Sequence, residues 1–279
     1  MKLKIYQQEA LNTLTSFCKN YKESSGKVEE AFNNTLKNSE QFSEPYEPYL
    51  KVKESTSPYI CIRIPTGGGK TLIAAKSLKP VIQELYENDK TFLVIWLAPK
   101  DIIVNQTIKA LKDPKHPYRK AIDEDFPSTS INVMKLKDAL TNTFNKKTDI
   151  TILVGSMQSF NVGNDDIRKF YYLNSNYANF LENSKYKDEP SLANAIKEAS
   201  PYIIIDEAHK ARANLSLSNI INLNPSFVLE LTATPERNHK PNAGKYASNI
   251  IYSVSASQLK AENMIKLPII LETVDNWEK

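Results

Sequence analysis

The run Gly67-Gly68-Gly69-Lys70-Thr71 has the residue types and spacing to hold a polyphosphate, and it follows an apolar stretch. Consecutive glycines let a backbone turn tightly and aim N–H groups at an anion, and a helix that starts there adds the positive end of its dipole. Lys70 supplies a point charge for terminal phosphates, and Thr71 supplies a hydroxyl for a phosphate-bound Mg²⁺. The run therefore predicts a phosphate-binding loop, which we extend to Thr66.

The loop departs from the pattern G-x-x-x-x-G-K-[ST] at the first position, where Ile64 stands in place of glycine. A glycine-rich turn between a strand and a helix is also an ordinary connection. The interpretation therefore needs support from the rest of the chain.

A second group of chemical interest, Asp206-Glu207, comes directly after the apolar residues 202–205. In a parallel sheet this pair would emerge at the same edge as the glycine loop. Asp206 is suited to hold Mg²⁺, mostly through water, and Glu207 is suited to orient and deprotonate an attacking water. The alternative is a solvated acidic strand end, but the presence of Lys70-Thr71 in the same chain favours catalysis.

Strands and helices that alternate along the chain would position these groups. The expected strands cover 59–64, 91–97, 131–134, 150–154, 202–205, 227–231 and 250–254, and the expected helices cover 4–20, 71–88, 101–111, 137–143 and 257–264, the second of them broken or kinked near Pro80. This order predicts an α/β fold in three layers, with a mainly parallel sheet and helices on both faces.

Composition sets limits on function. Hydrophobic residues make up 41% and charged residues 24%, which is typical of a soluble globular protein. The longest apolar run, Phe92–Ala98, is far shorter than the ~20 residues that span a bilayer, so we expect a cytoplasmic protein without a membrane partner. A net charge of +4 is compatible with nucleic acid but does not require it. Two cysteines and three scattered histidines predict neither a disulfide framework nor a zinc site.

Five motifs, taken in order, resemble those of superfamily 2 helicases of the DEAD/DEAH type. They are Gln7, Pro65–Thr71, Ala98-Pro99, Asp206–His209 and Thr232–Pro235. Their spacing fits one RecA-like P-loop NTPase domain with a long insertion before the acidic motif. The resemblance therefore implies the first motor domain of such a helicase.

The resemblance assigns ATP and Mg²⁺ as cofactors. It implies that Gln7 reads the adenine edge with Tyr6 packed nearby, and that residues 66–71 hold the phosphates. Lys70, Asp206 and Glu207 would be catalytic, with Thr71 and Asp206 at the metal. Three residues would couple the nucleotide state to the grip on nucleic acid, namely His209, Thr232 and Thr234.

Nucleic-acid contacts follow from the same resemblance. The matching positions are Pro99, Lys100, Gln106, Ser156 and Gln158. Contacts of this kind hold phosphates without reading bases, so binding should not depend on sequence. The alternative at Pro99-Lys100 is an ordinary strand-to-helix turn, and Gln106 could simply face solvent.

Within the superfamily, three segments look like type III restriction enzyme Res subunits. These are Ile64–Thr71, Trp96–Pro99 with Gln106-Thr107, and His116–Arg119. The implied function is an ATP hydrolase of the helicase or translocase type, weak as an isolated domain; DNA is the favoured nucleic acid, and the sequence leaves DNA versus RNA open. The implied partners are a second RecA-like domain and nuclease or methyltransferase subunits.

The motor domain should cover residues 1–264. It would comprise a first helix over 1–20, a polar excursion over 21–58 and an insertion over 161–200, with 265–279 leading toward a second motor domain. Tyrosines of the insertion could stack on bases, but a surface subdomain with these rings packed beneath it is the favoured alternative. They are Tyr171, Tyr172, Tyr177 and Tyr186.

Two other functions fit parts of the pattern. One is a module that binds nucleotide and then nucleic acid or a partner without hydrolysis. The other is a P-loop kinase for small molecules, against which both Thr232–Pro235 and the two carboxylates argue.

Overall fold

A seven-stranded parallel sheet forms the centre of the part of the chain that the computed structural model describes, which is residues 2–37, 45–47, 57–86, 92–144, 150–156, 165–207, 219–238 and 246–264. The strand order is β3-β4-β2-β5-β6-β1-β7. The strands are β1 (Tyr59–Arg63), β2 (Phe92–Ala98), β3 (Ile131–Lys135), β4 (Ile150–Ser156), β5 (Tyr202–Asp206), β6 (Phe227–Thr232) and β7 (Ile250–Ser253).

The strands are apolar without alternation because both faces of the sheet are covered. Along β2, Val94 and Trp96 belong to one core, whereas Leu93, Ile95 and Leu97 belong to the other. Successive side chains of a strand point to opposite faces, so one continuous apolar run supplies both cores.

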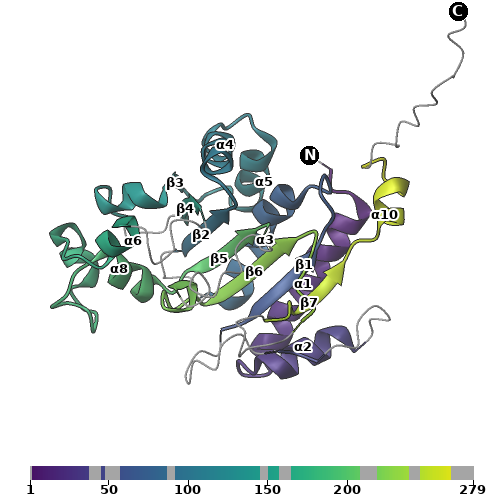
Figure 1. Ribbon diagram of the computed structural model, residues 1–279, viewed down its shortest axis with the longest axis horizontal. Helices are drawn as coiled ribbons and strands as arrows, with labels where there is room; N and C mark the ends of the chain where they lie inside the picture. The colour runs from purple at the N-terminus through teal and green to yellow at the C-terminus, as the bar shows by residue number, and fades with distance from the viewer. Residues whose placement is uncertain are drawn as a thin grey trace, which may run out of the picture.

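Helices on both faces complete three layers, which confirms the predicted fold class. The first core is covered by α1 (Ile5–Glu23), α2 (Val28–Leu36), α3 (Lys70–Leu85), α4 (Asp101–Lys112) and α5 (Pro117–Asp125). The second is covered by η1 (Leu136–Leu140), α6 (Asp165–Phe170), η3 (Ser175–Tyr177), α7 (Ala178–Leu181) and α8 (Leu192–Ala199). Figure 1 shows α4 and α5 side by side, and α10 (Ala256–Ala261) beside the N-terminal end of α1.

The helices differ from the prediction in three places. Of the expected break or kink near Pro80, the break is absent: α3 continues from Lys70 to Leu85, because the surrounding turns pack through buried residues such as Leu78 and Val81. The helix expected over 137–143 is instead a short 3₁₀ helix. The sequence analysis also missed α5, although Pro117 in its first turn is a start signal and the His116 side chain accepts a hydrogen bond from the Tyr118 N–H.

The described part of the insertion, from residue 165 on, forms helices and packs against the second core. Tyr177 is fully buried and its hydroxyl donates to the Ala139 carbonyl at 2.6 Å. Tyr171 and Tyr172 are 46% and 63% exposed. The packed alternative therefore applies to Tyr177 but not to Tyr172. Within the described ranges, no helix is both long and apolar enough to cross a membrane.

Candidate functional site

The sheet brings the predicted chemical groups to one edge. Strand β6 lies between β5 and β1, with Thr232 opposite Arg63 and Leu231 opposite Asp206. The glycine loop leaves the end of β1, Thr232 ends the neighbouring strand β6, and Asp206 ends β5, the next strand along the sheet. The expected shared edge is therefore present.

The glycine loop needs its glycines for two separate reasons. Gly67 and Gly69 have φ angles of 84° and 77°, in the left-handed region that favours glycine. At Gly68 the reason is space, because a Cβ there would lie 2.5 Å from Ile64 Cγ2. Ile64, which replaces the first glycine of the pattern, is fully buried. Its side chain packs directly beneath Gly68 and supports the loop.

Lys70 is already paired. Its Nζ lies 2.8 Å from Glu207 Oε1 and 3.5 Å from the Ile64 carbonyl oxygen. Only 8% of the Lys70 side chain and 19% of the Glu207 side chain are exposed. The predicted phosphate-binding cation and the predicted base therefore neutralise each other.

Asp206 has the properties of a cation ligand. Burial raises the pKa of its carboxyl to about 6, with Lys70 opposing the rise and Glu207 adding to it. Its Oδ1 is buried and has no hydrogen-bond partner among the residues that the structure describes. A buried, unsatisfied carboxylate oxygen at the phosphate-binding edge fits Mg²⁺, for which Thr71 could provide a further oxygen ligand.

Glu207 has a strained backbone. Its φ is 56°, which is uncommon for a residue with a side chain, and its N–H donates to the Leu231 carbonyl at 2.9 Å. The neighbouring strand thus holds Glu207 in this conformation. Strain of this kind is typical of functional sites.

Tyr6 and Gln7 contact the glycine loop directly. The Tyr6 hydroxyl donates to the Gly68 carbonyl at 2.9 Å, and Gln7 Nε2 donates to the same oxygen at 3.4 Å. The Gln7 amide oxygen accepts the Lys4 N–H at 3.0 Å. Gln7 is only 2% exposed. In this structure its amide supports the loop, and the reading of adenine stays a prediction.

The predicted nucleic-acid residues differ in accessibility. Lys100, the N-cap of α4, and Gln106, in the middle of that helix, are exposed, and Pro99 is half-buried. Ser156 pairs with Ala98 at the ends of β4 and β2 but is buried, so its side chain does not reach the surface here. Gln158 and His209 lie outside the described residues.

The two predicted coupling threonines lie where β6 ends. Thr232 is fully buried, whereas Thr234 is exposed. The Thr234 N–H donates to the Thr232 hydroxyl at 3.2 Å.

The sequence analysis missed the contribution of α10. Leu259 would lie 3.3 Å from a Cβ at Gly68, so α10 packs on the loop. Glu262 Oε1 accepts the Ile5 N–H at 3.1 Å, and the Glu262 carbonyl accepts from Lys4 Nζ at 3.0 Å. The two hydrogen bonds to Glu262 join residues more than 250 positions apart, so no local sequence pattern predicts them.

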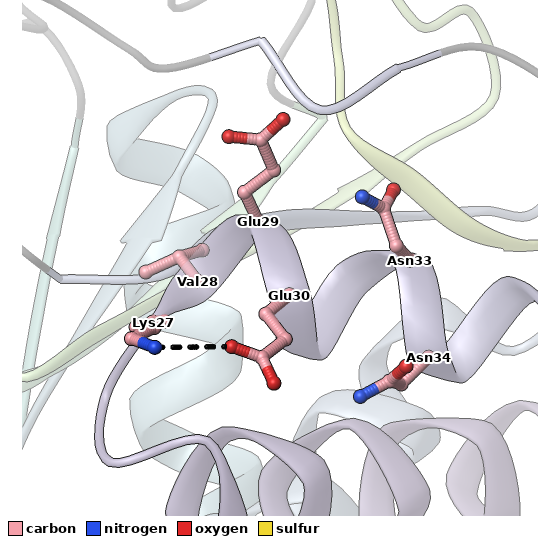
Figure 2. A pocket seen from close by; sticks show the side chains of 6 residues that line it. All are labelled: Lys27, Val28, Glu29, Glu30, Asn33 and Asn34. Atoms are coloured by element: carbon pink, nitrogen blue, oxygen red, sulfur yellow. Dashed lines mark ion pairs between the residues drawn. The ribbon is translucent and has the colours of Figure 1, made fainter.

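A surface hollow beside α2 is a separate feature (Figure 2). All the side chains that line it belong to α2 or its N-cap, and its cation, Lys27, is paired with Glu30 at 3.5 Å. None of the groups at the sheet edge takes part. We therefore assign the hollow no chemistry.

Gly68→Ala should damage both the fold and the loop. The new methyl group would meet Ile64 Cγ2 at 2.5 Å and the Pro65 carbonyl at 3.1 Å. We expect the free energy of unfolding to fall by about 1–3 kcal/mol, and triphosphate affinity to fall with it. Urea unfolding and a fluorescent triphosphate titration would measure the two effects.

Gly26→Ala is the matched control. Gly26 also has a positive φ, of 82°, but lies in the turn between α1 and α2. It should lose stability through backbone strain and keep its triphosphate affinity. Unchanged stability and affinity in Gly68→Ala would contradict the packing argument.

Comparisons with known proteins bear on the family. A family model described as "Type III restriction enzyme, res subunit" matches residues 1–237. No curated protein matches the chain.

Solved structures with similar folds include two Type ISP restriction-modification enzymes. The nuclease-deletion mutant of LlaGI in complex with a DNA substrate mimic is 15% identical, with a TM-score of 0.48, over 95% of this chain and 21% of that one. LlaBIII bound to DNA is 16% identical, with a TM-score of 0.46, over 94% and 16%. The UvsW helicase from bacteriophage T4 is 18% identical, with a TM-score of 0.36, over 80% and 66%. This chain thus spans about a fifth of the length of the LlaGI protein.

Proposed function

Since the chain belongs to the family of type III restriction enzyme Res subunits, and is thereby a superfamily 2 helicase motor domain, we propose that it binds ATP and Mg²⁺ and couples ATP hydrolysis to the binding or translocation of DNA. One observation carries the proposal. The glycine loop, the Lys70–Glu207 ion pair and the unsatisfied oxygen of Asp206 lie together at one edge of the sheet.

Binding of ATP would begin with an exchange of partners at Lys70. The loop N–H groups and the start of α3 attract the phosphates, and the phosphates compete with Glu207 for the ammonium group. Glu207 then loses its cation and becomes available as a base. Nucleotide binding would thus release the catalytic carboxylate from its resting contact.

Hydrolysis would use the two carboxylates differently. Asp206 and Thr71 would hold Mg²⁺, which supplies charge neutralisation to the phosphates when bound. Glu207 would orient a water and take its proton. Thr232 and Thr234, at the end of the strand beside Asp206, would couple the nucleotide state to the proposed DNA-binding surface, which comprises Pro99, Lys100 and Gln106.

The proposal includes partners. Hydrolysis in this superfamily takes place between two RecA-like domains, and an arginine from outside the P-loop domain can raise the rate by about 10³–10⁵. An isolated first RecA-like domain should therefore hydrolyse ATP slowly. The proposed partners are a second RecA-like domain, which would supply the arginine, and nuclease or methyltransferase subunits.

A second candidate is a nucleotide-dependent binding module without hydrolysis. The ion pair favours it, because Glu207 is engaged by Lys70 rather than poised toward water. Saturable ATP binding without turnover, with or without DNA, would support this candidate.

Lys70→Ala tests the proposed ATP site. A charge-assisted contact of about 1.5–3 kcal/mol corresponds to about 10- to 100-fold in affinity. We therefore expect Lys70→Ala to weaken the binding of a fluorescent ATP analogue, measured with Mg²⁺, by at least about tenfold.

Lys79→Ala is the matched control, because Lys79 also lies on α3 and pairs with a carboxylate, Asp125, at 3.6 Å. It should bind the analogue like the wild type. Equal affinity in Lys70→Ala and wild type would overturn the assignment of the loop.

A further inference from the structure

A fully buried carboxylate stands inside strand β6. Glu230 is 0% exposed and pairs in register with Ile205 of β5 and Cys61 of β1. Charged side chains are almost never fully buried unless they are paired, because burial without partners is costly. None of the steps proposed above uses Glu230, so its place two residues before Thr232 requires an explanation.

Ser248 connects this carboxylate to the loop that follows β6. Its hydroxyl donates to Glu230, with Oγ 3.2 Å from Oε1 and 3.4 Å from Oε2. The same oxygen accepts the Glu236 N–H at 3.1 Å, and the Ser248 N–H donates to the Glu236 carbonyl at 2.8 Å. A hydroxyl has one proton, so a fixed acceptor at Glu230 leaves the Ser248 lone pairs directed at Glu236.

Arg63 holds the same loop from the other side. Its Nε donates to the Ala233 carbonyl at 3.4 Å, and its Nη1 donates to the Ser253 hydroxyl at 3.3 Å. Arg63 is the last residue of β1, directly before Ile64 and the glycine loop. Loop 232–236 is therefore tied both to the strand that carries the phosphate site and to residues beside and within β7.

We propose that Arg63, Glu230 and Ser248 are positioning residues that fix loop 232–236, so that a change at the ATP site reaches the DNA-binding surface as a defined displacement. The proposal rests on the proposed function and adds the residues that would make the coupling possible. A turn alone does not need a buried carboxylate. Buried polar groups can instead select one conformation at a cost in stability, which is the property that a coupling element requires.

Ser248→Ala is the test, with DNA-dependent nucleotide affinity as its readout. The affinity of the full chain for a fluorescent ATP analogue would be measured with and without duplex DNA. Coupling between two sites typically changes affinity about 5- to 150-fold. The ratio of the two affinities, with DNA over without DNA, should lie in that range for the wild type and below about 2 for Ser248→Ala. The affinity without DNA should be the same in both proteins. A merely structural loss would instead lower the affinity itself.

Ser226→Ala is the matched control. Ser226 lies just before β6, at the opposite end of the strand, and its hydroxyl donates to the Pro201 carbonyl at 3.3 Å and also contacts the Tyr86 hydroxyl. This variant loses a comparable hydroxyl contact and should keep the wild-type ratio.

Amide hydrogen exchange provides a second measurement that needs no nucleotide. Loss of the Ser248 hydroxyl should speed exchange in a peptide over residues 232–236 about tenfold and leave the glycine loop unchanged. Unchanged exchange in that peptide would overturn the proposal even if the chain binds no ATP.

The possible failures are distinguishable. If analogue binding depends on Lys70 but Ser248→Ala keeps the wild-type ratio, the positioning role is wrong and the ATP site stands. If the wild-type ratio is itself about 1, the coupling role is likewise overturned. If binding does not depend on Lys70, the proposed function fails.

Discussion

Glu207→Gln is expected to slow ATP turnover by about 10²- to 10⁴-fold, the range that a positioned general base contributes. The amide would fit the same space but cannot take a proton from water. The ion pair with Lys70 would be lost at the same time. Released from Glu207, Lys70 should bind the phosphates more tightly, because the carboxylate no longer competes with them for the ammonium group.

The measurement requires turnover and binding on the same variant. Because an isolated first RecA-like domain should hydrolyse slowly, single-turnover assays with excess protein and duplex DNA are preferable to steady-state rates. Glu124→Gln is the control, since Glu124 is also paired with a lysine, Lys76, at 3.4 Å but lies on α5 away from the sheet edge. Wild-type turnover in Glu207→Gln would exclude Glu207 as the base.

Local sequence signals sufficed for the framework of the site. Asp206-Glu207 follows apolar residues with no polar interruption, and Gly67–Gly69 precedes a helix-forming run, so the strand ends could be identified from pattern alone. The parallel order then requires that these ends meet at one edge. The structure places β6 between β5 and β1 and thereby brings Thr232 beside both.

The contacts that tune the site could not be read in the same way. The Lys70–Glu207 pair depends on side-chain directions at the start of α3 and just after β5, and the Glu262–Ile5 contact joins the two ends of the described chain. Ile64 looked like a defect in the phosphate pattern. Its packing beneath Gly68 shows that an apolar side chain can support the loop instead of a glycine.

The two buried carboxylates, Glu230 and Asp206, could not be told apart from the sequence. Glu230 and Asp206 lie on adjacent strands within apolar segments, yet only Asp206 stands where a cation could reach it. From sequence, both are acids in or beside an apolar run. Their difference arises from position along the strand, because Asp206 ends β5 whereas Glu230 lies two residues before the end of β6.

Asp206→Asn should stabilise the metal-free protein at neutral pH while it removes the proposed metal ligand. Folding raises the Asp206 pKa from 3.8 to about 6, so between these values the folded state binds more protons than the unfolded state. Stability therefore falls as pH rises from about 4 to about 6, and the full cost applies above that. A shift of this size corresponds to at most about 3 kcal/mol. We expect a gain of about 1–3 kcal/mol at pH 7.5, since an asparagine stays neutral.

Thermal unfolding in a chelator would measure this gain, at about 2–4 °C per kcal/mol for a domain of this size. The difference from wild type should vanish near pH 4, where Asp206 is itself neutral in the folded state. Asp101→Asn, at an exposed position in the first turn of α4, should not gain stability at pH 7.5. The same Asp206→Asn protein should lose Mg²⁺-dependent ATP affinity by about tenfold or more, as expected for a lost charged contact. A gain in stability together with a loss of Mg²⁺-dependent ATP affinity would mean that the fold tolerates an unfavourable carboxylate because the cation site requires it. A less stable variant at pH 7.5 would instead make Asp206 a structural residue.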